Sequence, residues 1–595
     1  MNRPKLVVNI VLAAVLPSAF AQGGPPTGFI TKLGQDMDVR SGARIVSDDN
    51  VVGNLILPEL AGGVGGNPVV PQVQLRGGNV QVNDPAQTLI QIFPGFRPFV
   101  RATRSEVSSA AFGQNIVVTY NNSTGIHVSP NPGGPGLIVD RVLISGYSTS
   151  NDGGKTFTSA YMPLSVPGGV TAGDPSIAAD RHGNFYFANL AADATHGTIQ
   201  VNTSTDGGKT FGPGVVVQED DNSDKEWLAV GPDPLVKQRD NVYVTWTSFQ
   251  RTACELRFGR SIDGGATFTA KTIYVPTADP NPTHPQNCLQ FSNPVVDSIT
   301  GVLYIPFLHF SNSDQDFIQM LISDDAGETF HFATFNIPGA PNPTVMPVTQ
   351  PGEATECGAT IIAPHVVSVN FRLTIHTALN PGHSLTGLPR YTEASRMTLQ
   401  PALAARNGVL YLAWSNSTSP IFGDPNGKSN VLFVRSDDGG NIWSAPIIVN
   451  PVGSDKHHVL PSLAIDENPN SVHITYYTQH SDGTVDLDMA NSHDGGATFP
   501  VDRTIRVSST SFNLPPTNIP IPSVAQPFAT TNYDRQIATC YALGEYQSVT
   551  TANGSVYAGW GDMRNQITEP VNALDPISGQ THSEEDVFFQ KVKAQ

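Results

Sequence analysis

The sequence has few charged residues: they make up 14% of its 595 residues, against roughly a quarter in a typical globular protein. Basic residues are the scarcer kind, with 33 Lys and Arg against 51 Asp and Glu, so the formal net charge is −18. An acidic chain is repelled by nucleic acid and by anionic membrane surfaces. We therefore expect neither as a partner, and we expect Ser, Thr, Asn and Gln to supply the surface polarity.

Long hydrophobic runs are absent, with one short exception at the start. Arg3 and Lys5 precede an apolar run over 6–16, and Ala19-Phe20-Ala21 follows it. This run is too short to span a bilayer. A charged start, a short apolar stretch and an A-x-A site are typical of a cleaved secretory signal. The sequence predicts a signal peptide over 1–21, cleavage near Ala21, and a secreted or periplasmic monomer without a membrane span.

Cysteine is also scarce. The chain has only Cys254, Cys288, Cys357 and Cys540, and their spacing excludes a typical zinc site. An even number in an exported chain favours two disulfides, for which three connectivities exist. We predict the pairs Cys254–Cys288 and Cys357–Cys540.

The most informative feature is an eight-residue motif, S-x-D-x-G-x-[TI]-[FW], that occurs six times. The copies begin at Ser150, Ser204, Ser261, Ser323, Ser436 and Ser492. The starts are 54 to 62 residues apart, except for an interval of 113 between the fourth and fifth, which is close to two periods. A fixed period of this length indicates a repeat architecture.

Each copy is typical of a tight turn between two strands. Its Asp accepts backbone hydrogen bonds, its glycines adopt positive φ, and its last aromatic residue buries an anchor. The six copies resemble the Asp box, or BNR repeat, of the sialidase superfamily. That resemblance implies an all-β fold, a β-propeller, with each box joining the third and fourth strands of a blade. It also implies that the boxes lie on the face away from the active site.

A second pattern gives the number of blades. An apolar strand, a short turn and an aromatic-rich strand recur seven times, which indicates hairpins. The hairpins begin at Glu106, Asp174, Glu226, Asn293, Gln400, Leu460 and Glu545. We predict seven four-stranded blades. Six or eight blades are the alternatives, because a degenerate blade around 366–376 would add an eighth.

The seventh hairpin lacks a motif because the chain ends soon after its third strand, predicted at 586–591. Its fourth strand must come from elsewhere, or the ring would leave an open edge. The candidates are 80–82 and 89–93, near the N-terminus. We therefore predict a propeller over 79–595 that an N-terminal strand closes. Residues 22–78, rich in Gly and Pro, are predicted to be a partly disordered lead-in.

Two long insertions, at 331–396 and 500–540, interrupt the repeat and should hang over the top mouth of the propeller, where loops carry function. The first residues of the inner strands should ring this mouth and make it acidic, chiefly through Glu106, Asp174, Glu226 and Glu545. Glycoside hydrolysis needs one protonated and one ionised carboxyl. The alternative is that these side chains only bond neighbouring backbone.

The resemblance also implies site residues. Sialidases use a Tyr nucleophile with a Glu partner, an Asp acid, and three arginines that clamp the substrate carboxylate. The corresponding set here is Tyr533 with Glu545, Asp174 as the acid, and Arg104, Arg396 and Arg535 as the clamp, with Glu106 and Glu226 as further substrate contacts. The family's early F-R-I-P motif is replaced by Phe96-Arg97-Pro98-Phe99.

The leading functional prediction is an exported, sialidase-like glycoside hydrolase (exo-alpha-sialidase-like) acting on extracellular glycans. One alternative is a non-catalytic propeller that binds glycan or protein. Another is a polysaccharide lyase, which needs a base and a charge-neutralising group. No cofactor is required, and no metal ligand is assigned. The acidic run over 219–224 could bind Ca²⁺ through its oxygens, although a solvated acidic loop is the commoner origin of such runs.

Overall fold

The computed structural model describes the repeated part of the chain with gaps. The described residues are 78–87, 104–130, 137–193, 195–250, 253–276, 288–310, 317–336, 346–347, 365–366, 400–417, 421–422, 428–451, 457–466, 470–513, 543–568 and 581–593. Within them the regular structure is almost entirely strand. The helical content is two 3-10 turns, Ser123–Gly125 (η1) and Val501–Arg503 (η4). The protein is therefore all-β, as the motif spacing predicts.

Seven antiparallel sheets follow one another along the chain, and we call them blades 1 to 7. Blade 1 contains β2 (Ser108–Phe112), β3 (Asn115–Asn121), β6 (Ser145–Ser150) and β7 (Thr158–Tyr161). Blade 2 contains β8 (Val170–Ala179), β9 (Phe185–Ala192), β10 (Gly197–Ser204) and β11 (Val215–Glu219). Blade 3 contains β12 (Ser223–Pro232), β13 (Asp240–Phe249), β14 (Cys254–Ser261) and β15 (Thr269–Tyr274).

Blades 4 to 6 keep this order, and blades 4 and 6 carry additional short strands. Blade 4 contains β16 (Cys288–Gln290), β17 (Val295–Val296), β18 (Leu303–Phe310), β19 (Phe317–Ser323), β20 (His331–Phe332) and β21 (Met346–Pro347). Blade 5 contains β23 (Ala402–Arg406), β24 (Val409–Ser417), β26 (Ser429–Ser436) and β27 (Ile447–Ile448). Blade 6 contains β28 (His457–Ile465), β29 (Val472–Gln479), β30 (Thr484–Ser492), β31 (Ile505–Arg506) and β32 (Phe512–Asn513).

Blade 7 joins the two ends of the described chain. It contains β33 (Ser548–Ala552), β34 (Ser555–Asp562), β37 (Asp586–Lys593) and, as its fourth strand, β1 (Val80–Gln81). Val80 pairs with Phe589 and Gln81 with Phe588 in an antiparallel ladder. This confirms the predicted closure of the ring by an N-terminal strand and selects the 80–82 candidate.

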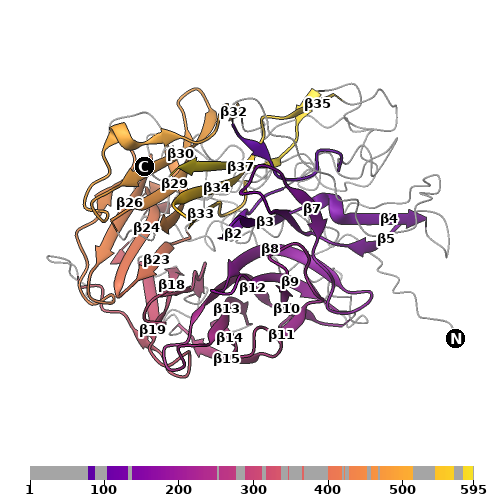
Figure 1. The fold of residues 1–595 in the computed structure, drawn as a ribbon, viewed down its shortest axis with the longest axis horizontal. Helices are drawn as coiled ribbons and strands as arrows, with labels where there is room; N and C mark the ends of the chain where they lie inside the picture. Colours follow the sequence, from indigo (N-terminus) through magenta and orange to yellow (C-terminus); the bar gives the residue numbers. More distant parts are fainter. Residues whose placement is uncertain are drawn as a thin grey trace.

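The blades form a closed ring (Figure 1), in which the inner strands surround the centre. Each inner strand contacts the next, in the order β2, β8, β12, β17, β23, β28, β33 and back to β2. Seven buried apolar clusters fill the spaces between adjacent blades. The core is therefore divided among the blade interfaces, as expected when each repeat buries its faces only against its neighbours.

The repeated motif forms the turn between the third and fourth strands, as predicted. In the copy from Ser261, the serine Oγ donates to Asp263 Oδ1 at 2.7 Å and accepts from Gly265 N at 2.9 Å. Thr267 Oγ1 donates to Asp263 Oδ2 at 2.6 Å. A Cβ on Gly154, whose φ is +84°, would lie 2.3 Å from the ring of Phe589 in blade 7. Glycine there allows the turn of blade 1 to pack against its neighbour.

The eighth-blade alternative is wrong. His365–Val366 (β22) pairs with Ile421–Phe422 (β25) in a separate two-stranded ladder, outside the seven blades. Two other ladders, β4–β5 (Ile126–Pro130, Leu137–Val142) and β35–β36 (Gln566–Thr568, Thr581–Ser583), also lie outside the blade sheets. Most of the predicted insertions at 331–396 and 500–540 fall outside the described residues.

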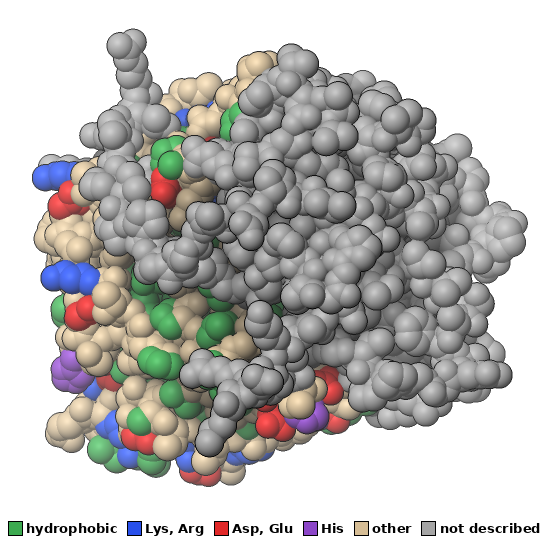
Figure 2. Space-filling model, turned by 90° about the vertical axis from the view of Figure 1, so that its right-hand side faces the viewer, with side chains coloured by type: hydrophobic (Ala, Val, Ile, Leu, Met, Phe, Trp, Pro, Cys, Tyr) green, Lys and Arg blue, Asp and Glu red, His purple; other side chains and the backbone are tan. Residues whose placement is uncertain are grey.

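The described surface reflects the low charge content. In Figure 2, acidic and basic side chains lie next to one another along the left and lower edges of the described surface, and hydrophobic groups, other side chains and backbone fill the area between. Among the described residues, no helix has the length and hydrophobicity needed to cross a membrane.

The ring closure makes a prediction about stability. Val82, fully buried in the cluster between blades 7 and 1, directly follows β1. We expect Val82→Ala to lower the free energy of unfolding by roughly 1–3 kcal/mol, because it removes buried methyl groups and leaves a cavity. Chemical denaturation measures the change. The control is Val216→Ala in β11, a side chain that is 39% exposed, and an equal loss in both variants would contradict the closure role.

Candidate functional site

In or just before the inner strands of blades 1 to 3, one residue has a left-handed backbone conformation, and these residues contribute to a shared central cluster. Glu106, Asp174 and Lys225 have positive φ, at 57°, 54° and 52°. Strand pairing shifts register around the last two, between Gly173 and Ser176 and between Asp224 and Trp227. A left-handed conformation is uncommon in residues other than glycine, and such strain gathers at functional sites.

These bulges assemble a central cluster around the Lys225 ammonium. Lys225 Nζ lies 2.9 Å from Glu545 Oε2, 3.2 Å from Glu106 Oε1 and 4.0 Å from Asp174 Oδ2. It also lies 4.2 Å from the centre of the Tyr546 ring, a cation–π contact. The five side chains come from blades 1, 2, 3 and 7. The ring thus brings together residues up to about 440 positions apart in the sequence.

The cluster is buried. The Lys225 side chain is 3% exposed, and the side chains of its three carboxylate partners are 0% exposed. With water excluded, the attraction between the charges is stronger than at a surface, and an unpaired charge would be costly. The cluster must therefore balance its charge among its own groups.

The Lys225 ammonium and protons on the carboxyl groups together balance the charge of the cluster. Burial raises the pKa of Glu106 to about 8 and that of Asp174 to about 7. The two side chains are hydrogen-bonded to each other, and this bond favours the proton on Glu106. Burial lowers the pKa of Lys225, but Glu106, Glu545 and Asp174 outweigh it and raise the pKa above its usual range. Near neutral pH the cluster holds a protonated carboxyl beside ionised groups.

Glu226, another predicted mouth residue, belongs to the same region. It is 1% exposed, and neither carboxyl oxygen bonds another described residue. Burial, followed by the charge of Asp174, raises its pKa well above the usual value. Burial thus favours the neutral form of Glu226, next to the central cluster.

Of the three arginines in the predicted clamp, Arg104 lies within the described residues. Arg104 is described and 1% exposed. Its Nη1 lies 2.7 Å from Asp586 Oδ1, and its guanidinium also donates to the backbone oxygens of Glu585 and Gln87. This arginine is directed at blade 7 and the N-terminal segment. Arg396, Arg535 and Tyr533 lie outside the described residues, so their roles stay predictions.

Sequence reasoning missed Lys225. The sequence pattern predicts that the hairpin of blade 3 starts at Glu226, but the register shift places Lys225 at the bulge position of Asp174 and Leu460. A signal was present, because Lys225 stands between two acidic residues directly before an inner strand. Only the ring reveals that its ammonium meets carboxylates from three other blades.

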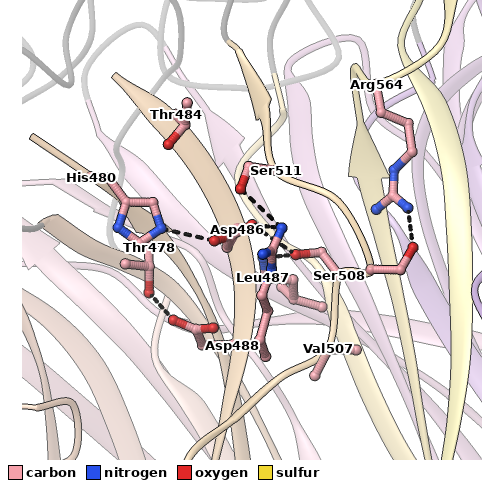
Figure 3. Close-up of polar contacts among 12 residues, drawn as sticks. Thr478, His480, Thr484, Asp486, Leu487, Asp488, Val507, Ser508, Ser511 and Arg564 are labelled. Atoms are coloured by element: carbon pink, nitrogen blue, oxygen red, sulfur yellow. Dashed lines mark hydrogen bonds and ion pairs between the residues drawn. The ribbon is translucent and has the colours of Figure 1, made fainter. Parts of the chain in front are cut away.

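A second polar cluster, shown in Figure 3, lies in blades 6 and 7. His480 Nε2 lies 2.8 Å from Asp486 Oδ2, and Arg506 Nη2 lies 2.8 Å from Asp486 Oδ1. Arg564 Nη1 donates to Ser509 Oγ at 2.9 Å and to Asn79 Oδ1 at 2.8 Å. These groups bond one another across blade 6, blade 7 and the N-terminal segment. The cluster therefore supports ring closure, and its contacts explain it without a ligand.

In the acidic run over 219–224, three of the carboxylates accept hydrogen bonds from other parts of the protein. Asp220 Oδ2 accepts from Trp246 Nε1 at 2.9 Å, Asp221 Oδ1 from Gly197 N at 2.8 Å, and Asp224 Oδ2 from Gln290 Nε2 at 2.7 Å. These carboxylates thus bond internal donors. Among the described residues, no group of three or more His, Cys, Asp or Glu could hold a metal ion. Ca²⁺ binding stays a prediction.

The disulfide pairings also stay predictions. Cys254 is 5% exposed. It begins β14, which contacts β16, the strand that begins at Cys288. Cys357 and Cys540 lie outside the described residues.

The chain is a seven-bladed β-propeller with a buried acid–lysine cluster at its centre. No family model matches it, and no curated protein matches it. Solved structures similar to it include sialidases and polysaccharide lyases. The Hadza microbial sialidase Hz136 is 14% identical, with 77% of each chain covered and a TM-score of 0.35.

Two further structures have the same low level of similarity. The Trypanosoma rangeli sialidase in complex with the inhibitor DANA is 12% identical, with a TM-score of 0.33; the match covers 82% of this chain and 59% of that one. The polysaccharide lyase Uly1 is 9% identical, with a TM-score of 0.44, and the match covers 89% of this chain and all of that one. At these values the comparisons carry no argument about function.

The central cluster predicts how stability depends on pH. The pKa of Glu106 in the folded protein, about 8, lies above the ordinary value of 4.5. Its contribution to the free energy of unfolding is therefore complete below about pH 4.5 and is lost as pH rises toward 8. In Glu106→Gln we expect the fall in the free energy of unfolding over this pH range to be smaller by about 1 kcal/mol or more. Chemical denaturation at several pH values measures it. Glu219→Gln, on an exposed residue of β11, is the control. Parallel curves for Glu106→Gln and the parent would refute the assignment.

Proposed function

We propose that the protein is an exported glycoside hydrolase that acts on extracellular glycans, with its acid/base chemistry in the central cluster. The observation that carries the proposal is the set of four carboxyls, Glu106, Asp174, Glu226 and Glu545, gathered from four blades next to a single ammonium. Such a site contains protonated and ionised carboxyls together. Glycosidic bond cleavage requires both forms, one to protonate the leaving oxygen and one to assist at the sugar carbon.

The proposed roles follow from these charges. Asp174, with a pKa raised to about 7 by burial, is the proposed acid. Glu545, held beside Lys225 at 2.9 Å, is the proposed ionised partner, with Tyr533 as the nucleophile in a sialidase-like reaction. Glu106 and Glu226 are proposed to contact substrate, together with Arg104, Arg396 and Arg535. Ligand binding in a propeller of this kind would take place at the mouth of the funnel.

A specific observation favours a second function, a non-catalytic propeller that binds glycan. The cluster carboxyls are almost completely buried, with exposures of 0% for Glu106, Asp174 and Glu545 and 1% for Glu226. A general acid must reach the oxygen that it protonates. If the cluster only holds the blades together, glycan would bind without turnover.

The assay that separates these functions uses the mature protein with fluorogenic sialosides and a panel of other glycosides. We expect hydrolysis of at least one substrate. Glycan-array binding without any turnover would establish the binding propeller instead. New ultraviolet absorbance from unsaturated uronic products, without hydrolysis, would establish a lyase.

The acid role of Asp174 predicts a large loss of rate on substitution. We expect Asp174→Asn to lower kcat by roughly 10²-fold or more, because an amide cannot deliver the proton. Asp502→Asn, on an exposed residue of η4, should leave kcat unchanged. Retention of parental kcat by Asp174→Asn would exclude this residue as the acid, and the same comparison applies to Tyr533→Phe and Glu545→Gln.

The same assignment predicts the alkaline side of the pH profile. The acid must be protonated, and the pKa of Asp174 is raised to about 7, chiefly by burial. Hydrolysis should therefore decline as pH rises through about 7, and kcat measured from pH 4 to pH 10 checks this. A rate that stays constant up to pH 9 would be incompatible with Asp174 as the proton donor.

A further inference from the structure

We propose that Lys225 is a positioning residue for the acid/base pair: its ammonium holds the Glu545 carboxylate ionised and in place, which leaves the shared proton on Glu106 and Asp174. This inference rests on the proposed function, because it assigns the acid and base roles within the same cluster. Its geometric part, a lysine as the internal counter-cation of the ring centre, stands without any catalytic activity.

The contact distances assign the two kinds of carboxyl. Glu545 Oε2 is the nearest oxygen to Nζ, at 2.9 Å, and Glu106 Oε1 follows at 3.2 Å. Asp174 Oδ2 is at the outer limit of an ion pair, at 4.0 Å. Coulomb attraction falls with distance and is strong in a water-excluded site. The ammonium therefore stabilises a charge on Glu545 most, and on Asp174 least.

The backbone fixes the ammonium in this place. Lys225 is in the left-handed region at φ 52°, and its N–H donates to Asp224 Oδ1 at 3.0 Å. Asp224 Oδ2 in turn accepts from Gln290 Nε2 of blade 4 at 2.7 Å. A non-glycine residue in this conformation is strained. The surrounding contacts maintain it, and the lysine side chain is thereby aimed at the centre.

The surroundings of Nζ are those of a primary-ammonium site. Carboxylate oxygens from blades 1 and 7 form ion pairs with Nζ, and the centre of the Tyr546 ring lies 4.2 Å from it. The ring is itself held, because Tyr546 Oη donates to the Pro175 oxygen at 3.1 Å and Trp227 packs edge-on against it at 4.7 Å. Aromatic faces and carboxylates together are suited to an alkylammonium ion. Removing the lysine side chain should therefore open a cavity that accepts a small amine.

The test compares Lys225→Met and Lys225→Ala with Lys209→Met, a control on an exposed lysine of a motif turn. Without the ammonium, the neighbouring carboxyls should take up protons at higher pH. In Lys225→Met we expect the acidic limb of the profile of kcat against pH to move to higher pH by at least one unit. At pH values below that limb, kcat should therefore fall tenfold. The fall in unfolding free energy with rising pH should also become steeper.

Chemical rescue makes the test independent of folding defects in one variant. Ethylammonium chloride should raise the melting temperature of Lys225→Ala and move its pH profile back, whereas ethanol or sodium chloride should not. None of the three compounds should affect the parent or Lys209→Met in this way. If Lys225→Met does not fold, this rescue and the charge-retaining Lys225→Arg replace it.

The outcomes separate the inference from the function on which it rests. Absence of hydrolysis in the parent would remove the catalytic role, while rescue of Lys225→Ala stability by ethylammonium would still confirm the internal counter-cation. Unchanged pH dependence of activity and stability in Lys225→Met, or stabilisation of Lys225→Ala by ethanol as much as by ethylammonium, would overturn the inference.

Discussion

Closure of the ring is the constraint on which the rest of the structure depends. Each blade is a small sheet with two apolar faces, and it buries both only when it has a neighbour on each side. The last blade lacks a strand of its own, and β1 supplies it by pairing with β37. Asn79, just before β1, adds hydrogen bonds to Val507 in blade 6 and Gln590 in blade 7. Two ends of the chain thus complete one sheet.

The central cluster is a consequence of that closure. Glu106 and Glu545 come from the first and last hairpins, and they lie near each other because blade 7 packs against blade 1. A Cβ on Gly544 would lie 2.3 Å from Glu106 Cγ, so glycine permits this approach. An open ring would separate the carboxylates and leave the Lys225 ammonium without half of its partners. Fold stability and the proposed chemistry therefore depend on the same interface.

Strain and charge meet at the same positions in this fold. The bulge residues of blades 1 to 3 are polar, whereas the bulge of blade 6 carries Leu460, which is buried in the apolar cluster between blades 6 and 7. Acidic residues without a cation would repel one another in a buried site. One lysine and the shared protons relieve that repulsion, which explains why a strongly acidic centre is compatible with a folded ring.

The sequence by itself determined the repeat, the strands and the blade number. Its information is local: the Ser–Asp–Gly turns bond within eight residues, as in Ser261 and Asp263, and the hairpins are short. It also predicted that Glu106, Asp174 and Glu545 lie around one centre, because equivalent positions in a ring face one centre. Only the tertiary structure decided that Lys225 lies among them and that Arg104 bonds Asp586 instead. A register shift of one residue in a bulge and pairing between distant blades depend on packing, which a single sequence does not display.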